Sequence, residues 1–129
     1  MYKLVLLAFT LSITTLALLN ALAQEFYLYW IYSWFDIPMH LLGGASVALG
    51  YQSRFMLARI APRLSFTLLS TILFVMTIGV LWEVYEYAMG AVVITGYAFD
   101  TMKDLTDDFL GAIVGYYVAQ SLIRMQTFL

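Results

Sequence analysis

Four long apolar runs occupy most of this 129-residue chain, and they constrain its fold more than any other feature of the sequence. Residues 4–23, 37–51, 64–87 and 105–123 contain few charged side chains or none. Only 11% of the chain is charged, whereas an ordinary soluble domain is about 25% charged. Because a helix needs about 20 predominantly apolar residues to cross a bilayer, the sequence predicts an integral membrane protein.

These runs predict an all-α fold, a polytopic membrane four-helix bundle in which residues 1–129 form a single transmembrane domain. An aromatic stretch at residues 26–35 suits a membrane interface, and the second span either takes residues from this stretch or extends to Leu57. The connections between the runs are short, so we expect no extramembrane domain. The predicted spans cover about residues 4–23, 35–55, 64–87 and 104–124.

The first run also has features of a secretory signal peptide. Lys3 precedes it, and Ala21, Leu22 and Ala23 end it with the small residues of a cleavage site. Its apolar part is longer than the roughly 7–15 residues usual in a signal peptide. A retained helix is therefore favoured over a cleaved segment.

The basic residues predict the orientation in the membrane, because Lys and Arg stay preferentially in the cytoplasm. Five of the six fall on one side of the predicted bundle, and Lys103, between the third and fourth spans, is the exception. Both termini are therefore expected in the cytoplasm, as in a multi-pass protein of the cell inner (plasma) membrane. The five are Lys3, Arg54, Arg59, Arg63 and Arg124.

The acidic residues fall on the opposite, outer half, where three predicted spans bring polar side chains to a similar depth. On the second span, Asp36 and His40 are four residues apart, and residues at that spacing share one face of a helix. On the third span, Glu83 and Glu86 share a face at a spacing of three residues. The only histidine of the chain is thus expected to lie near carboxylates.

The fourth span carries a stripe of aspartates. Asp100, Asp104 and Asp108 follow one another at four-residue intervals, and Gly111 and Gly115 continue the stripe inward. Small residues at this spacing let membrane helices approach closely. We therefore expect this face of the helix to point into the bundle.

Carboxylates that converge in a poorly hydrated place repel one another, so each must become protonated or acquire a cation. Lys103 is the only basic residue nearby, and its position beside Asp104 is not on the aspartate stripe. A divalent metal ion (Zn, Mn, Mg or Fe) is the expected cofactor, because oxygen ligands with one imidazole suit these ions. The predicted metal ligands are Asp36, His40, Glu83, Glu86, Asp100, Asp104 and Asp108.

Ordinary structural roles compete with this interpretation. Asp36 precedes Pro38 and has the position of a helix N-cap, and Asp100 is placed to cap the fourth span. Asp107 is expected to face solvent or the interface, and His40 could be only hydrogen-bonded to a neighbour. The two glutamates are harder to explain in this way, since carboxylates at a helix C-terminus oppose the dipole and acids within spans are usually functional.

The ordered motifs D-x-x-x-H, E-x-x-E and D-T-x-x-D-L-x-x-D-x-x-G-A-x-x-G lie between Asp36 and Gly115. This set resembles the VanZ-like and YjdF-like small inner-membrane proteins. Ile37, Glu86 and Asp108 stand where VanZ-like proteins usually have Lys, Gln and Asn, and the additional carboxylates bring the chain nearer to the YjdF-like side. The resemblance implies a polar site formed by the matching residues, and VanZ-like proteins are linked to glycopeptide-antibiotic resistance.

These observations favour a metal-dependent membrane hydrolase that acts at the outer leaflet on a lipid-linked phosphate or ester. A bound metal would make hydroxide available near neutral pH, and Glu83 or Glu86 would be the catalytic general base. The alternatives are a cation or proton transporter, although the inner half has no acids to continue a relay, and a non-catalytic membrane subunit. The absence of cysteine excludes thiol chemistry. Membrane lipids are the expected partners, no nucleic-acid-binding patch is present, and the oligomeric state is open.

Overall fold

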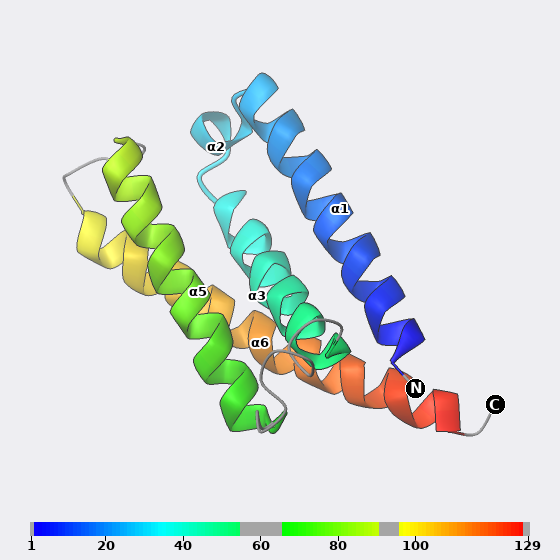
Figure 1. Ribbon diagram of the computed structural model, residues 1–129. Coiled ribbons are helices and arrows are strands. Elements are labelled where there is room, and N and C mark those ends of the chain that lie inside the picture. The colour runs from blue at the N-terminus through cyan, green and yellow to red at the C-terminus, as the bar shows by residue number, and fades with distance from the viewer. Residues whose placement is uncertain (1, 55–65, 91–95, 128–129) are drawn as a thin grey trace.

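The computed structural model describes residues 2–54, 66–90 and 96–127, and all of the regular structure in these ranges is helical (Figure 1). The all-α prediction is therefore confirmed for the described residues. A short helix follows the first of four long ones. The elements are α1 (Lys3–Glu25), α2 (Leu28–Ile31), α3 (Asp36–Ser53), α5 (Leu68–Met89) and α6 (Tyr97–Thr127).

The ends of the helices follow from the local sequence. Pro38 lies in the first turn of α3, where its missing N–H is not needed for a helical hydrogen bond. Thr67 caps α5, because its side chain accepts a hydrogen bond from the Ser70 backbone N–H at 3.3 Å. At its other end α5 stops at Gly90, whose φ of 68° lies in the left-handed region that glycine adopts readily.

Each long helix overlaps one of the apolar ranges expected to span the membrane, and α6 departs most from its expected bounds. It begins at Tyr97 rather than near residue 104, so Asp100 and Lys103 lie inside a regular helix. Some of the residues used for the predictions lie outside the described ranges, namely Arg59, Arg63 and the span residues 55 and 64–65.

Among the described helices, α1 and α5 are long and apolar enough to cross a membrane. Both leave large apolar side chains exposed, including Leu11 and Leu18 on α1 and Leu69 and Leu81 on α5. Burying such a side chain contributes about 1.5–3 kcal/mol, which a chain surrounded by water would forgo at each of these positions. A surface in contact with lipid removes that cost.

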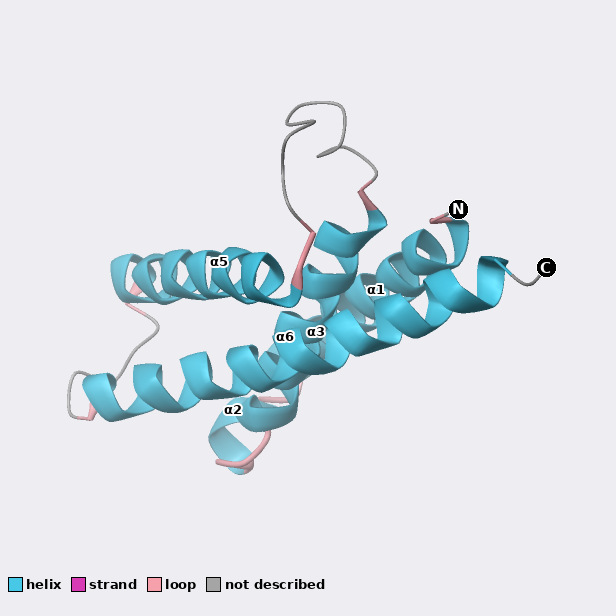
Figure 2. Cartoon of the chain, turned by 90° about the horizontal axis from the view of Figure 1, so that it is seen from below, coloured by secondary structure: helices cyan, strands magenta, loops and turns pink. Residues whose placement is uncertain are grey.

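The helices that carry most of the acidic residues, α3 and α6, form the most extensive helix pair of the described structure. On either side of α3 lie α1 and α5, and α6 crosses behind them in the view of Figure 1 (Figure 1, Figure 2). A Cβ added to Gly44 would collide with the backbone of Asp108, and one added to Gly111 with the backbone of Leu41. Glycine at these two positions therefore permits the close crossing.

A thin apolar layer fills the middle of the bundle. Ala48 on α3, Val75 on α5 and Ala112 on α6 are buried against one another. Their small side chains keep the three helices close. A second apolar cluster attaches α1 and comprises Val5, Leu49 and Ala119.

A buried polar network, the inner network, joins α3, α5 and α6 at the end of the bundle opposite Asp36. It comprises Gln52, Thr71 and Gln120. The Gln52 side-chain Nε2 donates hydrogen bonds to Thr71 Oγ1 at 2.7 Å and to the Phe66 carbonyl oxygen at 3.1 Å. Gln52 Oε1 accepts a hydrogen bond from Gln120 Nε2 at 3.3 Å. Gln52 is fully buried, and these three hydrogen bonds satisfy its amide, as burial requires.

Candidate metal centre

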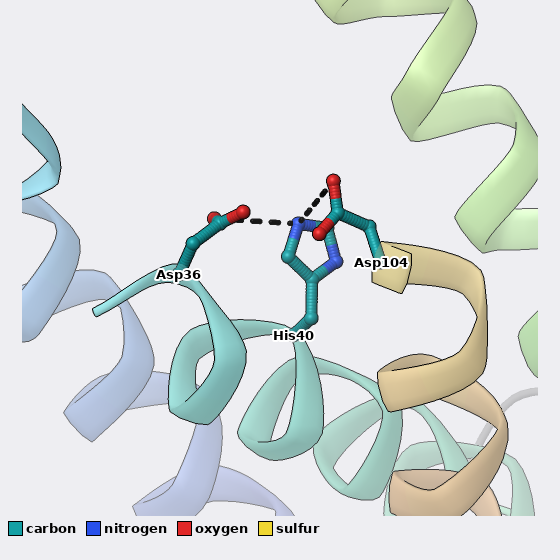
Figure 3. A group of neighbouring side chains, drawn as sticks. All are labelled: Asp36, His40 and Asp104. Atoms are coloured by element: carbon teal, nitrogen blue, oxygen red, sulfur yellow. Dashed lines mark ion pairs between the residues drawn. The ribbon is translucent and has the colours of Figure 1, made fainter. Parts of the chain in front are cut away.

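The imidazole of His40 is buried between α3 and α6 and is surrounded by three carboxylates. Its Nδ1 lies 3.3 Å from Asp108 Oδ1. Its Nε2 lies 3.6 Å from Asp36 Oδ1 and 3.8 Å from Asp104 Oδ2 (Figure 3). Both ring nitrogens therefore face carboxylates: Nδ1 faces one on α6, and Nε2 faces one on α3 and one on α6.

Helical spacing and small residues together produce this arrangement. Asp36 and His40 lie one turn apart on α3, and Asp104 and Asp108 lie one turn apart on α6. The close crossing of α3 and α6 brings the two pairs into contact. Gly79 of α5 adds room, because a Cβ at this position would lie 2.7 Å from Asp108 Oδ2.

Three of these residues have the geometry of a metal-ligand group. Asp36, His40 and Asp104 each offer one ligand atom within 4.8 Å of the others, and no other such group occurs in the part of the chain that the structure describes. When Nδ1 carries the ring proton and donates it to Asp108, the Nε2 lone pair faces Asp36 and Asp104. A carboxylate commonly holds the far nitrogen of a metal-binding histidine in this way. The residues present therefore fit a single divalent ion.

Lys103 neutralises part of this negative charge, although its position in the sequence is not on the aspartate stripe. Its Nζ lies 3.2 Å from Asp36 Oδ2, 2.9 Å from Asp100 Oδ1 and 3.1 Å from Asp104 Oδ1. The reason is its long flexible stem, which carries the ammonium across the helix surface. One ammonium leaves an excess of negative charge among the aspartates. We call the following set the outer cluster: Asp36, His40, Asp100, Lys103, Asp104 and Asp108.

The two glutamates expected to bind metal lie outside the group of three ligand atoms. Glu83 is 4% exposed; its Oε2 accepts a hydrogen bond from Thr101 Oγ1 at 2.7 Å, and its Oε1 has no hydrogen-bond partner among the described residues. Glu86 is only partly buried, and its Oε1 accepts a hydrogen bond from Trp82 Nε1 at 2.9 Å. The structure thus brings together three predicted ligands, Asp36, His40 and Asp104, and gives other contacts to Asp108, Asp100, Glu83 and Glu86.

Neither aspartate that was a candidate helix cap acts as one. Asp36 is itself the first residue of α3, and the N-cap residue Phe35 makes no side-chain capping hydrogen bond. The Asp36 carboxylate instead contacts His40 and Lys103. Asp100 lies in the first turn of α6 and pairs with Lys103. Both carboxylates therefore belong to the outer cluster.

Tyr29 and Thr101 lie near the acidic residues, and neither was predicted as a site residue, although Thr101 is part of the D-T-x-x-D motif. The Tyr29 hydroxyl donates a hydrogen bond to Asn20 Oδ1 at 2.9 Å. Burial, with the carboxylates of Asp36 and Glu86, raises the pKa of Tyr29 from 10.0 to about 12, so its phenol stays protonated at neutral pH. Tyr29 belongs to a continuous aromatic stretch, and its spacing does not distinguish it from its neighbours.

Comparisons with curated proteins and with solved structures return no match. The model of one protein family, described as a predicted membrane protein (DUF2238), matches residues 3–124. The match extends from the first residue of α1 into the last turns of α6 and contains the whole outer cluster. The more specific resemblance to VanZ-like and YjdF-like proteins stays a prediction. The chain belongs to the DUF2238 family of predicted membrane proteins.

Proposed function

We propose that four helices of this chain cross the inner (plasma) membrane, with the outer cluster near the outer, periplasmic face. Family membership and the apolar surfaces of α1 and α5 support a membrane location. Figure 1 shows both termini at one end of the bundle, away from the start of α3. Lys3 begins α1, Arg124 lies in the last turn of α6, and the Arg54 guanidinium lies over the Tyr2 ring. Since basic residues stay preferentially in the cytoplasm, this polarity supports cytoplasmic termini.

Within that arrangement, the protein is a metal-dependent hydrolase that acts on a lipid-linked phosphate or ester. The observation that carries this proposal is the convergence of ligand atoms from Asp36, His40 and Asp104 within 4.8 Å. These residues would hold the metal, and Asp108 would orient the His40 ring through Nδ1. A divalent ion lowers the pKa of a bound water towards about 7 and thereby supplies hydroxide.

Glu83 and Glu86 are the candidates for the general base that takes the proton from the attacking water. Glu83 fits this role better, because it is buried and one of its oxygens has no hydrogen-bond partner among the described residues. Thr101 holds the other oxygen and so orients the carboxylate. Glu86 is more exposed and is engaged by Trp82.

The surroundings of the outer cluster support a lipid-linked substrate. Trp30, Trp34 and Trp82 are exposed on segments at the same end of the bundle. Tryptophan is typical of the membrane–water interface, where its ring lies at the level of the headgroups. A site at that depth reaches the phosphate or ester bonds of lipids.

Elemental analysis of the detergent-purified protein tests the metal site. We expect about one equivalent of Zn, Mn, Mg or Fe in the unaltered protein, and little or none in Asp104→Asn, which loses one charged ligand. Asp107→Asn is the matched control, because Asp107 lies on the same helix but outside the ligand group, and it should keep its metal. An unaltered protein without metal, or equal metal in both variants, would overturn the proposal.

The interior below the outer cluster gives less support to a cation or proton transporter. Ala48, Val75 and Ala112 are buried between the outer cluster and the inner network, and no charged side chain of the described residues bridges them. An ion would have to lose its hydration to cross this apolar layer. Proteoliposomes that contain a pH-sensitive or Mn²⁺-sensitive dye are therefore expected to show no flux, and measurable flux would favour the transporter instead.

A further inference from the structure

Lys103 and a metal bound at His40 would share the same two carboxylates. Asp36 presents Oδ1 to His40 Nε2 and Oδ2 to Lys103 Nζ. Asp104 presents Oδ2 to His40 Nε2 and Oδ1 to Lys103 Nζ. An ion bound beside Nε2 therefore leaves both of these Lys103 contacts in place. The ammonium and a metal held by these residues would then share Asp36 and Asp104 as partners.

We propose that the metal and Lys103 together bind the phosphate group of the substrate, which selects a lipid-linked phosphate over a carboxylic ester. This inference rests on the proposed function. A metal with an open coordination position and a neighbouring ammonium would each contact a different oxygen of the same anion. Phosphate has such oxygens, and lysine binds it as a point charge. A carboxylic ester is neutral and lacks the charged oxygens that both contacts require.

The third partner of Lys103 is the one that phosphate would replace. The Asp100 side chain is 58% exposed, whereas that of Asp104 is 3% exposed. Water screens an exposed ion pair and makes its contribution small. Asp36 and Asp104 thus orient the ammonium, and a phosphate oxygen takes the place of Asp100. Asp100 is a competitor of phosphate in this arrangement.

Lys103 also lines an open cavity of about 330 Å³ on α6. Phe99 and Met102 line the same cavity and are 77% and 70% exposed, which suits contact with a hydrocarbon chain. Thr106 and Asp107 complete the lining. Because Asp107 repels phosphate, the phosphate group belongs at Lys103 and the metal, with the apolar part of the ligand over Phe99 and Met102. The cavity therefore favours a lipid as the source of the phosphate.

Ligand binding to the detergent-purified, Mn²⁺-loaded protein tests this inference. The probes are phosphatidate in mixed micelles, inorganic phosphate, and diacylglycerol as the neutral ester. We expect phosphatidate to bind in preference to diacylglycerol, and Lys103→Gln to weaken phosphatidate binding about tenfold or more, because one charged contact is lost. Lys103→Arg keeps the charge and should stay within about threefold of the unaltered protein. Arg124→Gln, near the other end of α6, is the matched control and should have no effect.

Asp100→Asn gives a prediction of the opposite sign. Removal of this competing carboxylate should strengthen phosphatidate binding by about two- to threefold, while Mn²⁺ affinity stays the same. This variant keeps Lys103 and its contacts with Asp36 and Asp104, so it decides the question even if Lys103→Gln does not fold. Circular dichroism of each variant reports whether the helices are intact. Weaker phosphatidate binding in Asp100→Asn would contradict the inference.

The outcomes separate this inference from the proposed function. Unchanged phosphatidate binding in Lys103→Gln, with Mn²⁺ still bound, overturns the role of Lys103 and leaves the metal site standing. Failure of the unaltered protein to bind Mn²⁺ overturns the proposed function and this inference with it. Binding of inorganic phosphate without phosphatidate supports the paired cations and overturns the lipid as the source.

Discussion

The inner network and the outer cluster are two polar regions that both join α3 to α6, at opposite ends of the bundle. The inner network consists of two amides and a hydroxyl, and every polar atom of the Gln52 amide is engaged. The outer cluster places four carboxylates around one imidazole and one ammonium. Burial of satisfied neutral groups costs little, whereas burial of surplus charge is expensive.

The difference assigns different roles to the two regions. Hydrogen bonds between polar side chains hold membrane helices together, and the inner network has no unmet requirement that a ligand would fill. Under the proposed function, a bound cation would relieve the surplus negative charge in the outer cluster. The apolar layer of Ala48, Val75 and Ala112 separates the two regions. Substitutions in the inner network should therefore have little effect on metal binding, and substitutions in the outer cluster should have little effect on stability.

Gln52→Ala is expected to have the largest effect and would break the inner network. It removes three hydrogen bonds and leaves a cavity, so the free energy of unfolding should fall by roughly 2–3 kcal/mol. Thermal unfolding in detergent measures this loss, and the metal content of the folded protein should not change. Unchanged stability would show that the inner network does not hold α3, α5 and α6 together.

Asp108→Asn should have a smaller effect, on metal affinity rather than stability. It removes the negative charge that holds His40 Nδ1, and loss of such a partner typically weakens metal binding about tenfold. Equilibrium dialysis against Mn²⁺ measures the change. The metal-free variant should be no less stable than the unaltered protein, because a buried charge has been removed. Lower stability with unchanged Mn²⁺ affinity would show that Asp108 has a structural role, like the residues of the inner network, and does not support metal binding.

Thr101→Ala should have the smallest effect. It removes the hydrogen bond to Glu83 Oε2, and the free energy of unfolding should fall by about 1 kcal/mol or less. Chemical unfolding in detergent measures it, with Thr101→Ser as the control that keeps the hydroxyl. Because Glu83 lies outside the ligand group, metal content should be unaffected. Loss of metal in Thr101→Ala would place Glu83 among the ligands and extend the outer cluster to α5.

Much of the outer cluster could be predicted from residue spacing, because a spacing of four residues places two side chains on one face of a helix. Asp36 with His40, and Asp104 with Asp108, are pairs of this kind. The glycines on α6 also indicated correctly which face of that helix packs closely. Contacts between helices could not be predicted, since they depend on how each helix is rotated against the next.

By itself, the sequence determined the helical class, the apolar segments and the pairs of polar residues that share a helix face, because run length and periodicity are properties of a single segment. Only the tertiary structure decided that Lys103 contacts Asp36 and that Gln52 joins three helices. It also decided that Glu83 contacts Thr101 instead of the ligand group. A long side chain takes its direction from the partners within its reach, and those partners are set by which helices cross and how closely their backbones approach.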